Sequence, residues 1–174
     1  MYVLWEKCLT TAGGIMAKIS AIQRAKNKEK YDAVVVSCFF EKGWNYITLN
    51  NIAKELGLRK SSAQAYYPSK MDFGLALKGK VFPVMMNELD LTSPESFISS
   101  WEKALTNNKI FTMVVHLLVS NATSHSTNQM TIGGITKLQG LMVKEWKNEA
   151  KADKAIYHVL GLSVMELAKA ENEI

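Results

Sequence analysis

Three helix-breaking residues, Gly43, Gly57 and Pro68, divide the middle of the chain into short segments, and this spacing constrains the fold more than any other feature. Each segment carries apolar residues at the three- and four-residue spacing of an amphipathic helix, and each ends at one of the breakers. The pattern predicts short helices at residues 27–42, 49–56 and 60–67.

The last two of these helices lie close enough together for a tight turn at Gly57 to join them. Thr48 provides the side chain that a helix N-cap requires, directly before the first of the pair. The second is short and polar. Two such helices in succession are typical of a helix-turn-helix unit, in which the second helix enters the major groove of DNA.

The rest of the 174-residue chain also favours helix, since it has only three prolines and no sustained alternation of apolar and polar residues. Hydrophobic residues make up 48% and charged residues 21%, which excludes a wholly disordered chain and indicates an all-α protein with its own core. Pro83 should end or kink a fourth helix that begins near Met71, and Ser93 should cap the next. We expect later helices at 94–105, 110–121 (apolar nearly all round and therefore buried), 132–150 and 153–170, with a loop at 122–131 and either a break or a continuation at 151–154.

Positive charge is concentrated in the first half of the chain. Residues 24–80 hold eleven Lys and Arg against five Asp and Glu, a net +6, whereas residues 81–174 hold eight against ten, a net −2. A basic segment followed by a slightly acidic one suggests that the first segment meets a polyanion such as DNA. Arg24, Lys26 and Lys28 could form a basic arm toward the duplex.

Other classes of protein are disfavoured by what the sequence lacks. No nucleophile motif, phosphate-binding loop or carboxylate pair stands out, so we expect neither an enzyme nor a cofactor. His125 and His158 have no metal-ligand spacing, and we expect no metal. His116 lies within an apolar helix, where a core histidine is expected in preference to a ligand contact. The apolar runs are too short to span a membrane, and the two cysteines, of which Cys38 should be a buried small residue, fit a cytoplasmic protein.

From Tyr31 to Leu77 the sequence resembles the tetracycline-repressor family of bacterial transcriptional regulators. That family shows an apolar first helix that ends in Phe-x-Glu-Lys-Gly, followed by a helix-turn-helix with a fixed pattern of residues. The positions that match in unbroken register are Phe39, Glu41, Lys42, Gly43, Thr48, Ile52, Ala53, Gly57, Leu58, Lys60, Tyr66, Ser69 and Lys70.

Four positions depart from the family pattern. Arg59 replaces a common serine, and Ser61 replaces a common glycine. Ala63 stands where the family has an aliphatic residue that packs the recognition helix inward, and Gln64 stands where a tyrosine often touches a phosphate. These changes put the operator sequence and affinity in doubt, and leave the expected fold unchanged.

The resemblance implies a double-stranded DNA operator as partner and assigns roles to the residues of the helix-turn-helix. Thr48 and Tyr66 would meet the phosphate backbone, and Arg59, Lys60 and Lys70 would add charge there. The short side chains of the recognition helix would face bases, where glutamine can pair bidentately with adenine. The expected DNA-binding residues are Thr48, Arg59, Lys60, Ser61, Ser62, Gln64, Ala65, Tyr66 and Lys70.

The resemblance also implies a helical body, at residues 71–174, that binds a small-molecule effector and forms a homodimer through its last two helices. The candidates for an effector pocket are Phe82, Met86, Trp101, Phe111, Met113 and His116. Two apolar stripes have the spacing of a four-helix interface, although the same residues could form the core of one protomer instead. The stripes are Ile135, Leu138, Met142 and Trp146, and Ile156, Leu160, Val164 and Leu167.

We therefore predict a cytoplasmic, dimeric repressor with a DNA-binding domain at residues 24–70, released from DNA when a ligand in the body changes the separation of the heads through the fourth helix. The alternatives are a regulator controlled by a protein partner, and a small helical enzyme or dimerisation protein. Residues 1–23 form either a short arm or a leader ahead of the true start, because Gly13-Gly14-Ile15-Met16 is what a ribosome-binding site before a start codon at Met16 would encode.

Overall fold

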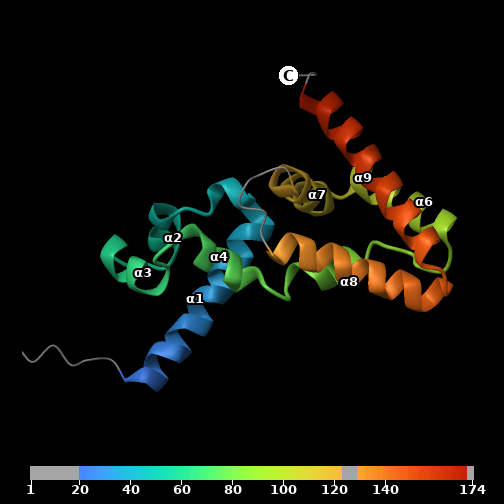
Figure 1. Ribbon diagram of the computed structural model, residues 1–174. Coiled ribbons are helices and arrows are strands. Elements are labelled where there is room, and N and C mark those ends of the chain that lie inside the picture. Colours follow the sequence, from blue (N-terminus) through green and yellow to red (C-terminus); the bar gives the residue numbers. More distant parts are fainter. Residues whose placement is uncertain (1–19, 123–128, 172–174) are drawn as a thin grey trace, which may run out of the picture.

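A computed structural model describes residues 20–122 and 129–171, and its regular structure within these residues is entirely helical (Figure 1). The prediction of an all-α protein is confirmed. The leader with Met16, and most of the expected loop at 122–131 with His125, lie outside the described residues. The elements are α1 (Ala21–Lys42), the 3-10 turn η1 (Trp44–Tyr46), α2 (Leu49–Glu55), α3 (Lys60–Tyr66), α4 (Lys70–Leu77), α5 (Val81–Met86), α6 (Pro94–Asn107), α7 (Lys109–Ala122), α8 (Gln129–Trp146) and α9 (Glu149–Glu171).

The buried side chains form two separate cores, which define a head (α1–α4) and a body (α5–α9). The head core surrounds Phe39, Ile52 and Phe73, and includes Cys38, whose thiol pKa is raised chiefly by burial. The body core surrounds Phe97 and Trp101 of α6. Because α4 contributes buried residues up to Leu77, the head core extends past residue 70, where the sequence suggested that the DNA-binding domain ends.

Helix α7 lies between the head and the body (Figure 1). One of its faces packs into the body core, and another packs against the head core. Phe111 and Val115 are buried in the body, whereas Met113 and Leu117 pack against the head core. We expected this helix to be buried all round, but only Phe111 and Val115 are, because the opposite face meets the edge of the smaller head and His116 is exposed.

Gly43 makes the close approach between α7 and the head feasible. Its φ of 80° lies in the left-handed region, which favours glycine. A Cβ atom at this position would also lie 3.2 Å from the sulfur of Met113. Both features explain why a glycine ends α1.

Helix α1 begins six residues before the expected start at residue 27. Ser20 is its N-cap, and its hydroxyl oxygen accepts a hydrogen bond of 3.1 Å from the backbone N–H of Gln23. The prediction of a basic arm was therefore wrong, because Arg24, Lys26 and Lys28 lie within a regular helix.

Two further boundaries differ from expectation. The fourth helix ends at Leu77, and Pro83 lies in the first turn of a separate helix, α5, where a missing N–H costs no hydrogen bond. The break between the last two helices falls at Lys147, whose φ is 53°, rather than at residues 151–154, which continue α9. Asn148 caps α9 by accepting a 2.9 Å bond from the N–H of Lys151.

Candidate nucleic-acid interface

The helix-turn-helix consists of α2 and α3, joined by a turn at Gly57 with a φ of 63°. Thr48 caps α2 as expected, since its hydroxyl oxygen accepts a 3.2 Å hydrogen bond from the N–H of Asn51. The turn closes through a 2.9 Å bond from the N–H of Leu58 to the carbonyl of Ala53. These bonds fix where α2 begins and where it ends.

In helix α3 one small side chain faces the head core, and the polar side chains face solvent. Ala63 is fully buried, and the neighbouring polar side chains are exposed on the opposite side. The expected DNA-binding residues that the structure exposes are Thr48, Arg59, Lys60, Ser61, Ser62, Gln64, Ala65 and Lys70, and Tyr66 is half-buried. Eight of them therefore lie on accessible surface, seven in the helix-turn-helix and one, Lys70, at the start of α4.

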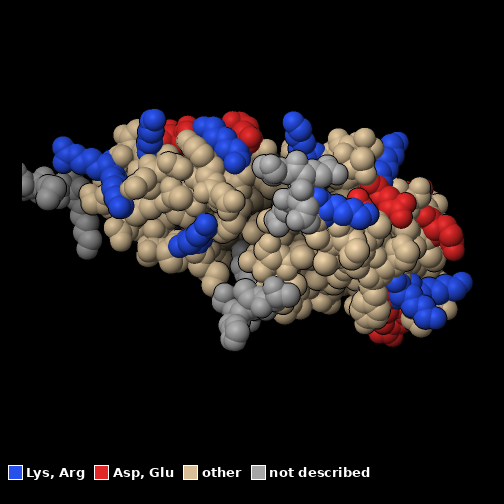
Figure 2. All heavy atoms as spheres, turned by 90° about the horizontal axis from the view of Figure 1, so that it is seen from above, with Lys and Arg blue, Asp and Glu red and all other residues tan. Residues whose placement is uncertain are grey.

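Basic side chains project from the head, at the left of Figure 2, and from the body, and acidic side chains lie beside some of them in both parts. In the head, the ammonium group of Lys70 lies 4.9 Å from the centre of the Trp44 ring, a cation–π contact that holds the lysine near the start of α4. Ser69 precedes it and donates two hydrogen bonds to Asp72, from its backbone N–H (2.9 Å) and its hydroxyl (2.7 Å). These bonds hold the pKa of the Asp72 carboxyl below its usual value.

A cluster of three polar side chains ties the end of α1 to α2. The carboxylate of Glu55 accepts hydrogen bonds from the ammonium of Lys42 at 2.7 Å and from the hydroxyl of Tyr46 at 2.5 Å. The bond from Lys42 lowers the pKa of Glu55, and the same bond raises the pKa of Lys42. Lys42 is therefore engaged within the head and is a poor candidate for a phosphate contact.

A second polar group, at the end of α3, was missed by reasoning from the sequence. The hydroxyl of Tyr67 donates to Asp32 at 2.8 Å, and the ammonium of Lys28 lies 4.4 Å from the centre of the Tyr67 ring. Arg24 approaches the preceding residue, Tyr66, from the same helix α1. The signal that could have revealed this arrangement is Ser20-x-x-Gln23, a capping-box pattern that places the start of α1 early enough to reach both tyrosines.

The six residues expected to line an effector pocket are dispersed. Trp101 and Phe111 pack edge to face at 5.0 Å in the body core, Phe82 and Met86 lie at its margin, Met113 packs against the head, and His116 is exposed. An open depression of about 460 Å³ involves none of them. It is lined by Asp90, Glu95, Ser96, Ser99, Ser100 and Lys103.

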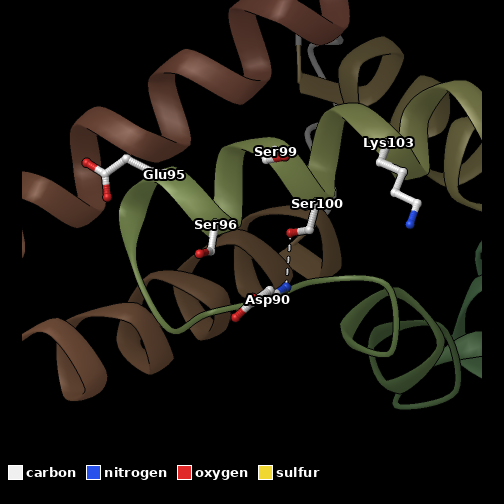
Figure 3. A pocket seen from close by; sticks show the side chains of 6 residues that line it. All are labelled: Asp90, Glu95, Ser96, Ser99, Ser100 and Lys103. Atoms are coloured by element: carbon white, nitrogen blue, oxygen red, sulfur yellow. Dashed lines mark hydrogen bonds between the residues drawn. The ribbon is translucent and has the colours of Figure 1, made fainter.

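Figure 3 shows that the side chains around this depression do not converge on one point. The hydroxyl of Ser100 accepts a 3.0 Å hydrogen bond from the backbone N–H of Asp90, while Glu95 points away from Ser100 (Figure 3). A second depression, between α6 and α9, is lined by Pro94, Glu95, Ile98, Lys151, Lys154, Ala155 and His158. Among the described residues, no group of three or more His, Cys, Asp or Glu could hold a metal ion.

The two stripes expected at a dimer interface face mostly inward. Leu138, Met142 and Ile156 are buried in the body core, and Ile135, Leu160 and Leu167 pack at its margin. Trp146 is held inside the protomer, because its indole N–H donates to the carbonyl of Leu91 at 2.7 Å. Of the eight residues, only Val164 is exposed, at 47%.

Comparison with known families agrees with this fold of a helix-turn-helix head on a helical body. Residues 78–167, about half of the chain, match the family described as tetracycline repressor LuxT C-terminal domain. The chain belongs to this family of tetracycline-repressor regulators. The matched span starts directly after α4, so it covers the body. The resemblance of the head to the same family is carried separately, by the helix-turn-helix pattern between Tyr31 and Leu77. A search of curated proteins found no match. In residues 20–122 and 129–171, every helix is too short or too polar to cross a membrane.

Proposed function

We propose that this regulator binds double-stranded DNA as a homodimer and represses transcription. The observation that carries the proposal is the outer face of α3, which presents Ser61, Ser62 and Gln64 to solvent beside the cations Arg59 and Lys60. Short polar side chains on a helix of this width fit the major groove, where they can reach base edges. The flanking cations match the phosphate backbone.

Lys70 extends this surface beyond the recognition helix. It is exposed at the start of α4, and its contact with Trp44 limits the positions that its ammonium group can take. A lysine restrained in this way suits a phosphate contact, because less side-chain entropy is lost on binding. We assign Lys60 and Lys70 to the DNA backbone and Gln64 to a base.

A single recognition helix reads too few base pairs to select one site in a genome, so the proposal requires two copies. Helix α9 offers a surface for the second copy that is distinct from most of the expected stripe. Tyr157, Val164 and Met165 are 69%, 47% and 60% exposed, and Gly161 lies between them with open space where a Cβ would point. Residues 157, 161, 164 and 168 recur at helical spacing, so they share one face of α9.

The adjoining helix α8 has the same character. Leu141 is an exposed apolar residue, and Gly140 beside it faces open space. Exposed apolar residues on two neighbouring helices of a helical body are the usual mark of a protein interface. We propose that this α8–α9 face joins the two copies and sets the distance between their heads.

Release by a small-molecule effector remains part of the proposal, with no assigned pocket. The dispersal of the six candidate residues argues against one cavity that all of them line. Control by a protein partner is the alternative, and a screen for compounds that weaken DNA binding would separate the two.

The proposal is tested by measuring DNA binding at several salt concentrations. Lys60→Ala combined with Lys70→Ala should weaken binding and reduce the salt slope by about 1 for each phosphate that is no longer bound. The matched control is Lys103→Ala with Lys144→Ala, which removes two exposed cations from the body. An unchanged slope in the head variant would remove both lysines from the interface, and absence of DNA binding in the unaltered protein would refute the proposal.

A further inference from the structure

Helix α3 is weakly anchored by its own residues. It has seven residues, too few for a helix that is stable in isolation. Its only buried residue is Ala63, whose methyl group contributes little apolar area to the head core. The orientation of the recognition helix must therefore be set by contacts at its ends.

The C-terminal end of α3 is held by the first turns of α1. The guanidinium of Arg24 donates to the backbone carbonyl of Ala65 and lies 5.0 Å from the centre of the Tyr66 ring. The carbonyls in the last turn of a helix have no partner within the helix, so this bond supplies one. A cation at a helix C-terminus also interacts favourably with the helix dipole.

Two further residues of α1 complete the contact with Tyr66. The side-chain amide of Asn27 donates to the Tyr66 hydroxyl at 3.4 Å, and the ring of Tyr31 meets the Tyr66 ring edge to face at 4.9 Å. Asn27 is itself held by a 2.9 Å bond from the side chain of Gln23, one turn earlier. The side chain of Tyr66 is thus contacted by three residues of one helix.

Given the proposed DNA binding, we propose that Arg24 is a positioning residue, which orients the recognition helix through Ala65 and Tyr66 so that its outer face fits the major groove. Residues 60–66 then read DNA with a geometry that α1 maintains. The small Ala63 makes this support necessary, because a larger aliphatic side chain would anchor the helix from within.

The alternative role for Arg24 is a direct phosphate contact. The two roles differ in what they affect. A phosphate contact contributes to binding of any sequence and adds to the salt slope. A positioning residue affects base readout, so its removal weakens binding to the preferred site and leaves binding to unrelated DNA unchanged. Lys26 provides a matched control, because it is an exposed cation on the same helix, two residues away.

The experiment compares Arg24→Ala with Lys26→Ala on two DNAs, a site that the protein selects from a random pool and a scrambled duplex. We expect Arg24→Ala to reduce affinity for the selected site by about 10-fold or more, as for a hydrogen bond to a charged group. Its affinity for the scrambled duplex and its salt slope should equal those of Lys26→Ala. Equal reductions on both DNAs together with a smaller slope would overturn the proposal in favour of a phosphate contact.

Hydrogen exchange in the free protein provides a second readout that does not require DNA. In Arg24→Ala the backbone amides of Gln64, Ala65 and Tyr66 should exchange faster, while those of α2 stay unchanged. Unchanged exchange at α3 would overturn the proposal, since the helix would then be held without Arg24. If the unaltered protein binds no DNA, the proposed function fails, and the exchange measurement still decides whether α1 holds α3.

Discussion

The head and the body of this protein are held together in different ways. Apart from the long α1, the head consists of short helices, α2 to α4, whose ends are tied to α1 by polar side chains, such as Glu55 with Lys42 and Tyr67 with Asp32. In the body, the longer helices α6 to α9 pack through large apolar residues such as Phe97, Trp101 and Phe111. Short helices bury too little area to fix their own geometry, so directional bonds complete it, whereas long helices achieve this through packing.

The largest expected effect comes from two substitutions on α9, in the body, that should abolish specific DNA binding by the head. Val164→Glu with Met165→Glu places two charges on the exposed face of α9 and should yield monomers, because a buried unpaired charge disfavours association. Monomers should keep their helical content and lose specific DNA binding. Sedimentation, circular dichroism and binding to the selected site would measure the three properties.

Lys103→Glu, an exposed change on α6, is the control for added negative charge and should leave the dimer intact. A double variant that remains dimeric would place the interface elsewhere. The pair Trp146 and Leu160 is less suitable for this test, since both pack inside the protomer and charges there would unfold the body.

The second prediction concerns the packing of the body. Phe111→Ala removes a fully buried ring that meets Trp101, and it should lower the free energy of unfolding by about 3–5 kcal/mol through reduced apolar burial and a cavity. Chemical denaturation would measure this change. The neighbouring Ile110 is only half-buried, and Ile110→Ala should cost clearly less. Equal effects would mean that the body depends less on its apolar core than we infer.

The third prediction concerns the polar ties of the head. Tyr67→Phe keeps the ring and removes the hydroxyl that donates to Asp32, which should cost about 1.5–3 kcal/mol for a bond to a charged group. Chemical denaturation, monitored with a spectroscopic probe in the head, would detect this loss of stability. Tyr46→Phe, which removes an exposed hydroxyl from Glu55, should cost less because exposed pairs contribute little.

The Tyr67 hydroxyl also predicts a pH dependence at the alkaline end. Burial and then the bond to Asp32 raise the pKa of Tyr67 in the folded head. The protonated hydroxyl therefore contributes its full stabilisation at pH values below the pKa of an unfolded tyrosine, which is about 10. This contribution is lost as the pH rises from there toward the higher pKa of the folded head. Tyr67→Phe should therefore lose less stability than the unaltered protein between neutral and strongly alkaline pH. An identical alkaline profile would show that Tyr67 does not control it.

Much of the head could be predicted from sequence because its helices are bounded by residues with local effects. Thr48, Gly57 and Ser69 act on bonds within a few residues of themselves, so the sequence alone locates α2, α3 and α4 closely. The start of α1 was missed because residues 23–30 contain a single apolar residue, Ala25, so the apolar periodicity of the helix becomes visible only from Tyr31 onward. The contacts of Arg24 with α3 span 41 residues and leave no trace in local spacing.

The body could be predicted only as a set of helices. Helices α8 and α9 carry apolar residues on more than one face, and which face is buried depends on α6 and α7, whose positions no local pattern gives. Ser163 illustrates this. Its buried hydroxyl donates to the carbonyl of Val159 within α9 at 2.6 Å, and it also accepts from the indole N–H of Trp101 at 3.0 Å, a partner 62 residues away that no local pattern gives. The exposed face of α9 became visible only once the inner face was known.

The double role of α7 has a consequence for how the molecule melts. A helix with Phe111 in one core and Met113 in the other cannot detach from either without exposing apolar surface in both. Head and body should therefore unfold in a single cooperative transition instead of two, although each has its own core. The protein would then behave thermodynamically as one folding unit, in which damage to the body lowers the stability of the head as well.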